Sequence, residues 1–175
     1  IAYTETPTKD FIPINLRLGT SLGTEFDDYN KMSFAFDINK LLVPTPPLRV
    51  DVNGDGVKEI VAGMDPDVSV VSGIFQSFWD APGGTKEEFR ELNYSAGLEY
   101  WYAEQFAVRA GYFYEHPTKG DRQYFTMGAG VKYNVFALDF SYLIDASSSI
   151  NGTNPLANTL RFTLIFDFGS LEAKS

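Results

Sequence analysis

The clearest pattern along the chain is an alternation of apolar and polar residues with a period of two. From Gln105 to Glu115, large apolar residues occupy every second position, and most positions between them carry small, polar or charged residues. The segment from Leu160 to Phe168 repeats the same alternation. Strict alternation predicts β-strands that have one apolar and one polar face.

Seven segments with this pattern can be read, and most are about ten to thirteen residues long. An ordinary globular strand has about five to six residues, whereas a strand that crosses a membrane at a tilt needs about nine to eleven. The lengths therefore favour an all-β fold, a transmembrane antiparallel β-barrel of the bacterial outer membrane, over a soluble β-sandwich. The segments are Phe11–Thr24, Tyr29–Leu41, Phe89–Tyr102, Gln105–Glu115, Arg122–Tyr133, Val135–Ile144 and Ala157–Phe168.

Short and long connections join these segments. Short turns at one end of the strands and long loops at the other are typical of outer-membrane barrels. The aromatic residues, which include 15 Phe and 10 Tyr, concentrate near the predicted strand ends, as expected for girdles at two membrane interfaces. The short connections are Glu25–Asp28, Tyr102–Glu104 and the turn around Asn134, and the long ones are His116–Asp121, Asp145–Leu156 and Leu42–Glu88.

Composition argues against several classes of function. The chain has 175 residues, enough for one domain, and its formal net charge of -9 argues against a nucleic-acid-binding protein. It contains no cysteine, and no nucleophile with an orienting acid lies near its single histidine, His116, in the sequence. We therefore expect a protein that is not an enzyme.

The polar faces of the predicted strands carry equal numbers of positive and negative residues. A charge that faces lipid costs up to about 2–4 kcal/mol, so these residues are expected to face the barrel lumen. Equal numbers favour an ion-paired or plugged interior over a pore selective for one sign of ion, and a merely hydrated interior fits equally well. The residues are Arg17, Lys31, Asp37, Glu91, Glu99, Arg109, Glu115, Arg122, Lys132, Asp139, Arg161 and Asp167.

Seven strands cannot close a single-chain bacterial barrel, which has an even number of strands. An open edge would leave backbone groups without hydrogen bonds in lipid. We therefore expect residues 1–168 to form the C-terminal half of a barrel whose other strands precede Ile1 or belong to another chain. Residues 169–175 are interpreted as a tail or an expression scar.

The connection Leu42–Glu88 is long and rich in apolar residues, which argues against simple disorder. Helical spacing of its apolar residues from Val71 to Trp79 predicts a short amphipathic helix. We expect this loop to bind a partner protein, and the alternative is that it packs on its own barrel. The predicted partner-binding residues are Leu42, Val43, Ile74, Phe75, Phe78 and Trp79.

The same loop contains a segment that resembles a calcium-binding loop. Oxygen-bearing residues stand at its positions 1, 3, 5 and 9 and glycine at position 6, but position 12 holds Ala62 in place of a bidentate acid. A shorter loop of this kind would close with the acid at position 9 and could add Asp65 or Asp67. The alternative is a tight turn rich in Gly and Asx residues. The predicted calcium ligands are Asp51, Asn53, Asp55 and Glu59.

Several runs of sequence resemble one protein family. They are Phe11–Pro13, Asn15–Gly19, Asn39–Pro47, Ile74–Phe78, Asp80–Gly84, Glu99–Tyr102, Gln105–Tyr112, Tyr133–Phe136, Leu138–Tyr142, Asn154–Leu156 and Asn158–Phe162. Together they resemble the C-terminal half of PorV (LptO), the outer-membrane barrel of the type IX secretion system, among the FadL-like fourteen-stranded barrels. The resemblance extends over nearly the whole chain and is weakest from Arg49 to Gly63.

The resemblance implies a role in protein secretion, with the chain as a multi-pass protein in outer-membrane lipid. Members of the family associate with a translocon barrel (SprA/Sov-like), receive substrates through their C-terminal signal domain and pass them to a PorU-like attachment protein. The seven strands would then be strands eight to fourteen, and the N-terminal half of the barrel is missing here. The alternative function is uptake of hydrophobic small molecules, as in FadL-like transporters, although paired charges argue against an apolar conduit.

Overall fold

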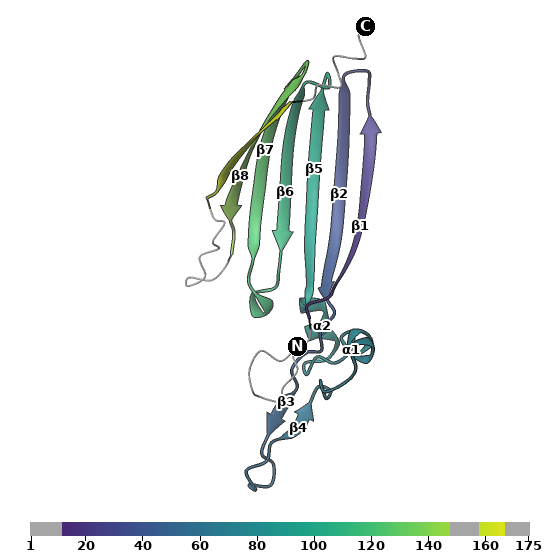
Figure 1. The fold of residues 1–175 in the computed structure, drawn as a ribbon, viewed down its shortest axis with the longest axis vertical. Coiled ribbons are helices and arrows are strands. Elements are labelled where there is room, and N and C mark those ends of the chain that lie inside the picture. The colour runs from purple at the N-terminus through teal and green to yellow at the C-terminus, as the bar shows by residue number, and fades with distance from the viewer. Residues whose placement is uncertain (1–11, 148–157, 167–175) are drawn as a thin grey trace. The chain divides into compact units, whose positions relative to one another are not determined.

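The computed structural model describes residues 12–147 and 158–166, and it contains a seven-stranded antiparallel sheet. The strand order is β1-β2-β5-β6-β7-β8-β9, so neighbours in the sheet are neighbours in the chain except for the insertion between β2 and β5 (Figure 1). All seven strands predicted by the alternation are confirmed. They are β1 (Asn15–Glu25), β2 (Asn30–Leu41), β5 (Leu92–Tyr102), β6 (Phe106–Tyr114), β7 (Gln123–Tyr133), β8 (Phe136–Asp145) and β9 (Leu160–Phe166).

The register of the sheet places Arg109 and Tyr112 on opposite faces. Glu99 pairs with Arg109, and Arg109 pairs with Gly128, so these three residues share one face. Tyr112 lies three residues after Arg109 on β6 and therefore points to the other face. There it pairs with Phe125 of β7, and the centres of the two rings lie 4.6 Å apart. We call the side with Arg109 the polar face and the side with Tyr112 the apolar face.

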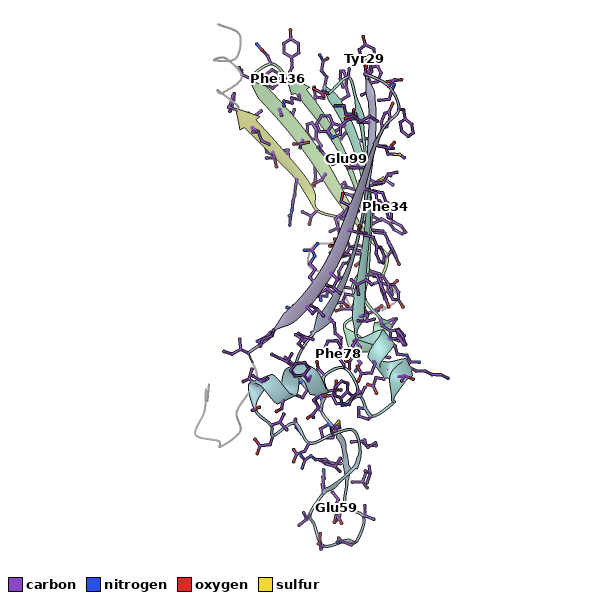
Figure 2. The ribbon with its side chains drawn as sticks, turned by 90° about the vertical axis from the view of Figure 1, so that its right-hand side faces the viewer. Tyr29, Phe34, Glu59, Phe78, Glu99 and Phe136 are labelled. Carbon is purple, nitrogen blue, oxygen red and sulfur yellow. The ribbon has the colours of Figure 1, made fainter. Side chains whose placement is uncertain are left out.

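The apolar face is formed by large side chains that remain open to solvent within the described residues. Phe34 of β2, Met127 of β7 and Phe162 of β9 are all exposed, and Phe34 is labelled in Figure 2. A water-soluble monomer rarely exposes a continuous apolar surface of this kind. The sheet therefore has the surface chemistry that a hydrocarbon environment would favour.

Cysteine labelling should separate the two faces, because the chain has no native cysteine that would react. We expect single cysteines at Arg109 and Asp139 to react with a membrane-impermeant thiol reagent, and cysteines at Tyr112 and Tyr142 to react with a lipid-soluble one. The alternation of side chains across a strand is the reason. Labelling of the Arg109 position from lipid would contradict the orientation.

The short turns lie at one end of the sheet, and Tyr29 and Phe136 mark that end (Figure 2). The turn between β5 and β6 has Ala103 at φ 53° and Glu104 at φ 55°, the left-handed pair that a type I′ hairpin requires. In the β1–β2 turn the Asp27 carboxylate accepts hydrogen bonds from the backbone N–H groups of Tyr29 and Asn30. Tight hairpins at this end agree with the predicted short connections.

The chain divides into two compact units, and the long loop belongs to the first. The loop unit comprises residues 1–17 and 39–92, and the sheet unit comprises residues 18–38 and 93–175. Besides the ends of β1 and β2, the loop unit contains a hairpin and two helices. They are β3 (Leu48–Val50), β4 (Glu59–Ala62), α1 (Val70–Gln76) and α2 (Thr85–Arg90).

The helix predicted from Val71 to Trp79 is present as α1, but it ends at Gln76, so Phe78 and Trp79 follow it. The hairpin and α2 have no counterpart in the prediction. The strand expected from Phe89 begins three residues later, because Phe89 and Arg90 belong to α2. A 3-10 helix, Pro117–Lys119, lies in the connection between β6 and β7. Phe11, Asp167, Phe168 and the tail 169–175 lie outside the described residues.

None of the helices in the described part of the chain has the length and apolar character needed to cross a membrane.

Candidate functional site

The polar face carries a three-residue ion cluster centred on Arg109. Its Nε donates to Glu99 on β5, and its Nη1 donates to Asp139 on β8. The Trp101 ring lies 5.4 Å from the guanidinium carbon, which adds a cation–π contact. The guanidinium crosses β7 at Gly130, where a Cβ would lie 3.0 Å from Nη1 and 2.5 Å from the Asp139 carboxylate. Gly130 therefore provides the space in which the cluster forms.

A hollow of about 700 Å³ adjoins this cluster within the sheet unit. Small residues such as Ser33, Gly97 and Gly111 line it, together with the three members of the ion cluster. Each carboxylate of the cluster has a side-chain exposure near one third, so water reaches the charges. The polar face is thus hydrated and ion-paired, and the single Arg109 serves two acids.

The remaining charges predicted for the polar face occupy different environments. Lys31 bonds to Glu104 at 2.7 Å and to Glu25 at 3.1 Å at the short-turn end. Arg161 on β9 pairs in register with Ser141, which places it on the polar face, and Asp37 borders the hollow. Arg17 belongs to β1.

Glu115 and Arg122 lie one residue outside β6 and β7 and not on the strands as predicted, although the Arg122 guanidinium lies 5.8 Å from the centre of the Phe113 ring, which is on the polar face. Both lie in the β6–β7 connection, where the Arg122 guanidinium donates to the two Glu115 oxygens at 2.7 and 2.8 Å. Glu91 also lies outside the strands, directly after α2. Glu115 and Arg122 form an ion pair with each other beyond the strand ends. The alternation of polar and apolar residues does not predict such a pair.

Helix α1 presents its apolar residues outward and its small and polar residues inward. Gly73 and Gln76 are the buried residues of the helix, and Ser77, which follows it, is completely buried. The Gln76 amide donates to the Asp65 carbonyl at 2.8 Å, and the Ser77 hydroxyl donates to the Ile74 carbonyl at 2.8 Å. A helix stabilised only by its own domain buries its apolar face, so this orientation is inverted.

The outward residues form a surface that we call the α1 patch. Phe75 is 61% exposed and Trp79 is 62% exposed, although each could bury about 150–250 Å². Phe78 is less exposed, and its ring centre lies 5.8 Å from the Lys40 ammonium. The patch comprises Val71, Phe75, Phe78 and Trp79.

Not all residues predicted for partner binding belong to this surface. Leu42 is buried, and its backbone N–H donates to the Ile14 carbonyl at 2.7 Å, so it belongs to the core of the loop unit. Val43 and Ile74 are half-buried. The candidate partner-binding residues are therefore reduced to the exposed aromatic residues Phe75, Phe78 and Trp79, because the buried side chain of Leu42 is not accessible to a partner.

A buried ionic network joins β2 to α2 and to the segment between the two helices of the loop unit. The Lys40 ammonium, only 6% exposed, donates to Glu88 and to Glu91 at 2.9 Å each. The second oxygen of Glu88 accepts the Ala81 N–H at 2.9 Å, and that of Glu91 accepts the Thr45 hydroxyl at 2.9 Å. This network connects β2 to Ala81, which lies shortly after the α1 patch, and no local pattern in the sequence indicates it.

Asp80 is completely buried beside this network. One of its oxygens accepts the Thr45 N–H at 2.9 Å, whereas Oδ1 has no hydrogen-bond partner. Burial raises the pKa of Asp80, and the nearby Glu88 and Glu91 raise it further, against the opposing Thr45 hydrogen bond. Asp80 therefore holds a proton to higher pH than an ordinary aspartate.

The predicted calcium ligands lie in the β3–β4 hairpin, where Figure 2 labels Glu59. The Asp51 carboxylate accepts the N–H groups of Gly54 at 2.6 Å and Gly56 at 3.0 Å, and Glu59 accepts the Val52 N–H at 3.1 Å. No three His, Cys, Asp or Glu side chains in the described residues converge on a point suitable for a metal. In this arrangement the carboxylate oxygens of Asp51 and Glu59 accept backbone N–H groups and so stabilise the turn. To bind calcium, these side chains would have to turn toward the ion.

Limited proteolysis tests the calcium hypothesis. If the ion binds Asp51, Asn53, Asp55 and Glu59, a chelator should speed cleavage in the hairpin, because the ion orders the loop. Asp51→Ala should remove the difference between chelated and calcium-loaded samples. Equal cleavage with and without chelator would leave the turn interpretation standing.

The first strands of the chain match a known family. Residues 1–48 match the family model described as type IX secretion system protein PorV. The chain is thus similar to this family over about its first quarter. No curated protein matches the chain significantly.

The PorV match includes β1 and β2 and ends at Leu48, where β3 begins. It therefore contains Lys40, the cation of the buried network, and Leu42 of the core. The α1 patch, the Asp51–Glu59 hairpin and the Arg109 cluster lie beyond the matched residues.

Proposed function

We propose that this protein is an outer-membrane component of the type IX secretion system that binds the translocon and exported substrates. The sheet would form part of a FadL-like transmembrane β-barrel, with the apolar face toward lipid and the polar face toward the lumen. The PorV match supports the secretion role, and the long antiparallel strands with one exposed apolar face support the barrel.

The inverted helix α1 is the observation that carries the binding role. Large apolar residues enriched at interface hot spots, here Phe75 and Trp79, stay exposed while polar and small residues occupy the buried side. Folding of the loop unit does not explain this arrangement. We propose that the α1 patch docks on the translocon barrel, and that the protein passes substrates bearing a C-terminal signal domain to a PorU-like attachment protein.

A transporter of hydrophobic small molecules is the second candidate. The hollow of about 700 Å³ on the polar face is large enough for a small ligand. However, Glu99, Arg109 and Asp139 line it, and these charges suit a hydrated interior better than an apolar ligand. Retention of a radiolabelled fatty acid by the purified protein would favour this candidate.

Affinity purification from outer membranes of a type IX secreting bacterium tests the proposed function. We expect the tagged protein to recover the translocon barrel and to migrate faster on gels before heating than after it, as folded outer-membrane barrels do. Cells without the protein should retain substrates that carry the C-terminal signal domain. Normal secretion in such cells, with no translocon recovered, would contradict the proposal.

A further inference from the structure

The α1 patch lies on a surface with a pronounced acidic character. Residues 60–85 contain no Lys, Arg or His, whereas Asp65 and Asp67 directly precede α1. Over the whole connection 42–88, three basic and eight acidic residues give a formal net charge of -5, although two of the acids, Asp80 and Glu88, have little or no exposed side chain. A partner that covers the patch must therefore accept both apolar side chains and negative charge.

The two aspartates before α1 are available to such a partner. The Asp65 side chain is 64% exposed, and its nearest cation, Arg49, is a weak and exposed neighbour at 3.8 Å. Asp67 is exposed and forms no ion pair within the described residues. The Gln76 amide bonds to the Asp65 backbone carbonyl, so Asp65 is held beside α1, which carries Phe75 and is followed by Trp79.

The same charge argues against a lipid surface as the occupant. Helices that lie on membranes carry Lys and Arg on their polar side, which anionic lipids attract. Helix α1 has no basic residue in its last turn and is preceded by two acids. An anionic membrane surface would repel this region, whereas a basic protein surface would attract it.

We propose that the α1 patch binds a hydrophobic recess of a protein that is bordered by lysine and arginine side chains. The apolar residues supply the contact area, and Asp65 and Asp67 pair with the basic border. This inference rests on the proposed function, because it specifies the chemistry of the partner surface. It predicts that binding weakens as the salt concentration rises. It also predicts that binding depends on the carboxylates of Asp65 and Asp67, which lie outside the apolar contact.

Fluorescence of Trp79 provides a direct measurement. The chain has two tryptophans, so Trp101→Phe leaves Trp79 as the reporter. The probes are two synthetic helical peptides with the same leucine face, one flanked by lysines and one by glutamates, and vesicles of phosphatidylglycerol. We expect only the lysine-flanked peptide to shift the Trp79 emission to the blue.

Neutralising the two aspartates should weaken this binding. Asp65→Asn with Asp67→Asn keeps the side-chain oxygen that accepts the Asp67 N–H, so the local turn is retained. Exposed ion pairs contribute little individually, so we expect about three- to tenfold weaker binding. The remaining affinity should change less between about 50 mM and about 500 mM salt than that of the parent protein. Asp28→Asn, in the exposed β1–β2 turn, is the control and should change neither property.

Equal binding of both peptides, or a blue shift with the vesicles, would overturn the inference. Recovery of the translocon from membranes separates it from the proposed function. If the parent protein and the Asp65→Asn, Asp67→Asn variant recover the translocon equally at every salt concentration, the basic border is wrong and the secretion role stands. If the parent protein recovers none, the secretion role itself fails.

Discussion

Changing Phe75 and Trp79 to serine should abolish recovery of the translocon while the protein still folds. Both side chains are more than half exposed, so their loss removes little buried area from the loop unit. Truncating a hot-spot residue costs about 2 kcal/mol or more, so the pair should weaken the complex by roughly two to three orders of magnitude. Affinity purification and secretion of a substrate with the C-terminal signal domain are the measurements.

The choice of Trp79 over Phe78 follows from the structure, because the Phe78 ring also contacts Lys40. Val52→Ser is the matched control, since Val52 is exposed on the β3–β4 hairpin of the same unit. Heat-modifiable migration and membrane location should be unchanged in both variants. If the Phe75→Ser, Trp79→Ser variant does not fold, the two residues are structural. If it folds and secretes normally, the docking proposal is wrong.

Replacing Lys40 with methionine should detach the helices of the loop unit. Its ammonium is the cation shared by Glu88 and Glu91, whose side chains are each 11% exposed. Removing one partner of a buried ion pair typically costs about 3–5 kcal/mol, because the remaining charge stays without compensation. We expect rapid proteolysis near residues 77–91 and loss of translocon recovery, with the sheet intact in the membrane.

Lys31→Met is a closely matched control because Lys31 lies on the same strand and also contacts two glutamates. Those glutamates, Glu25 and Glu104, are about 70% exposed, so water can solvate them when the lysine is removed. The control should resist protease as the parent protein does. Comparable cleavage of both variants would show that the buried network does not hold the loop unit.

The strands could be predicted from the sequence because successive residues of a strand point to opposite faces of the sheet. Where the two faces meet different environments, apolar and polar residues therefore alternate along the chain. In β6, Val108 and Arg109 differ in character as neighbours, and the structure places them on opposite faces. The spacing of Val71, Ile74 and Phe75 likewise predicts the helix α1. Helical spacing indicates which residues share a side, but it does not determine whether that side is buried, which is why the inversion of α1 appears only in the structure.

The buried network could not be predicted because its members are far apart in the chain. Lys40 lies 48 residues from Glu88 and 51 from Glu91, and nothing in the local sequence connects them. The Arg109 cluster was predicted only as a set of inward charges. Its central feature, the space left by Gly130, depends on the pairing of β7 with β8. Short elements such as β3, with three residues, are too brief to show a period.

The tight hairpins at the short-turn end also limit how the lengths of the connections can change during the evolution of proteins with this fold. The turn at Ala103 and Glu104 has two residues with left-handed backbone, and an inserted residue there would shift the register of β5 against β6. The connection between β2 and β5 contains two helices and a separate hairpin, and the connection between β6 and β7 contains a 3-10 helix, while each of these strand pairs stays adjacent in the sheet. Among the described connections, those between β2 and β5 and between β6 and β7 can therefore vary in length, and with it in binding specificity, more freely than the tight hairpins.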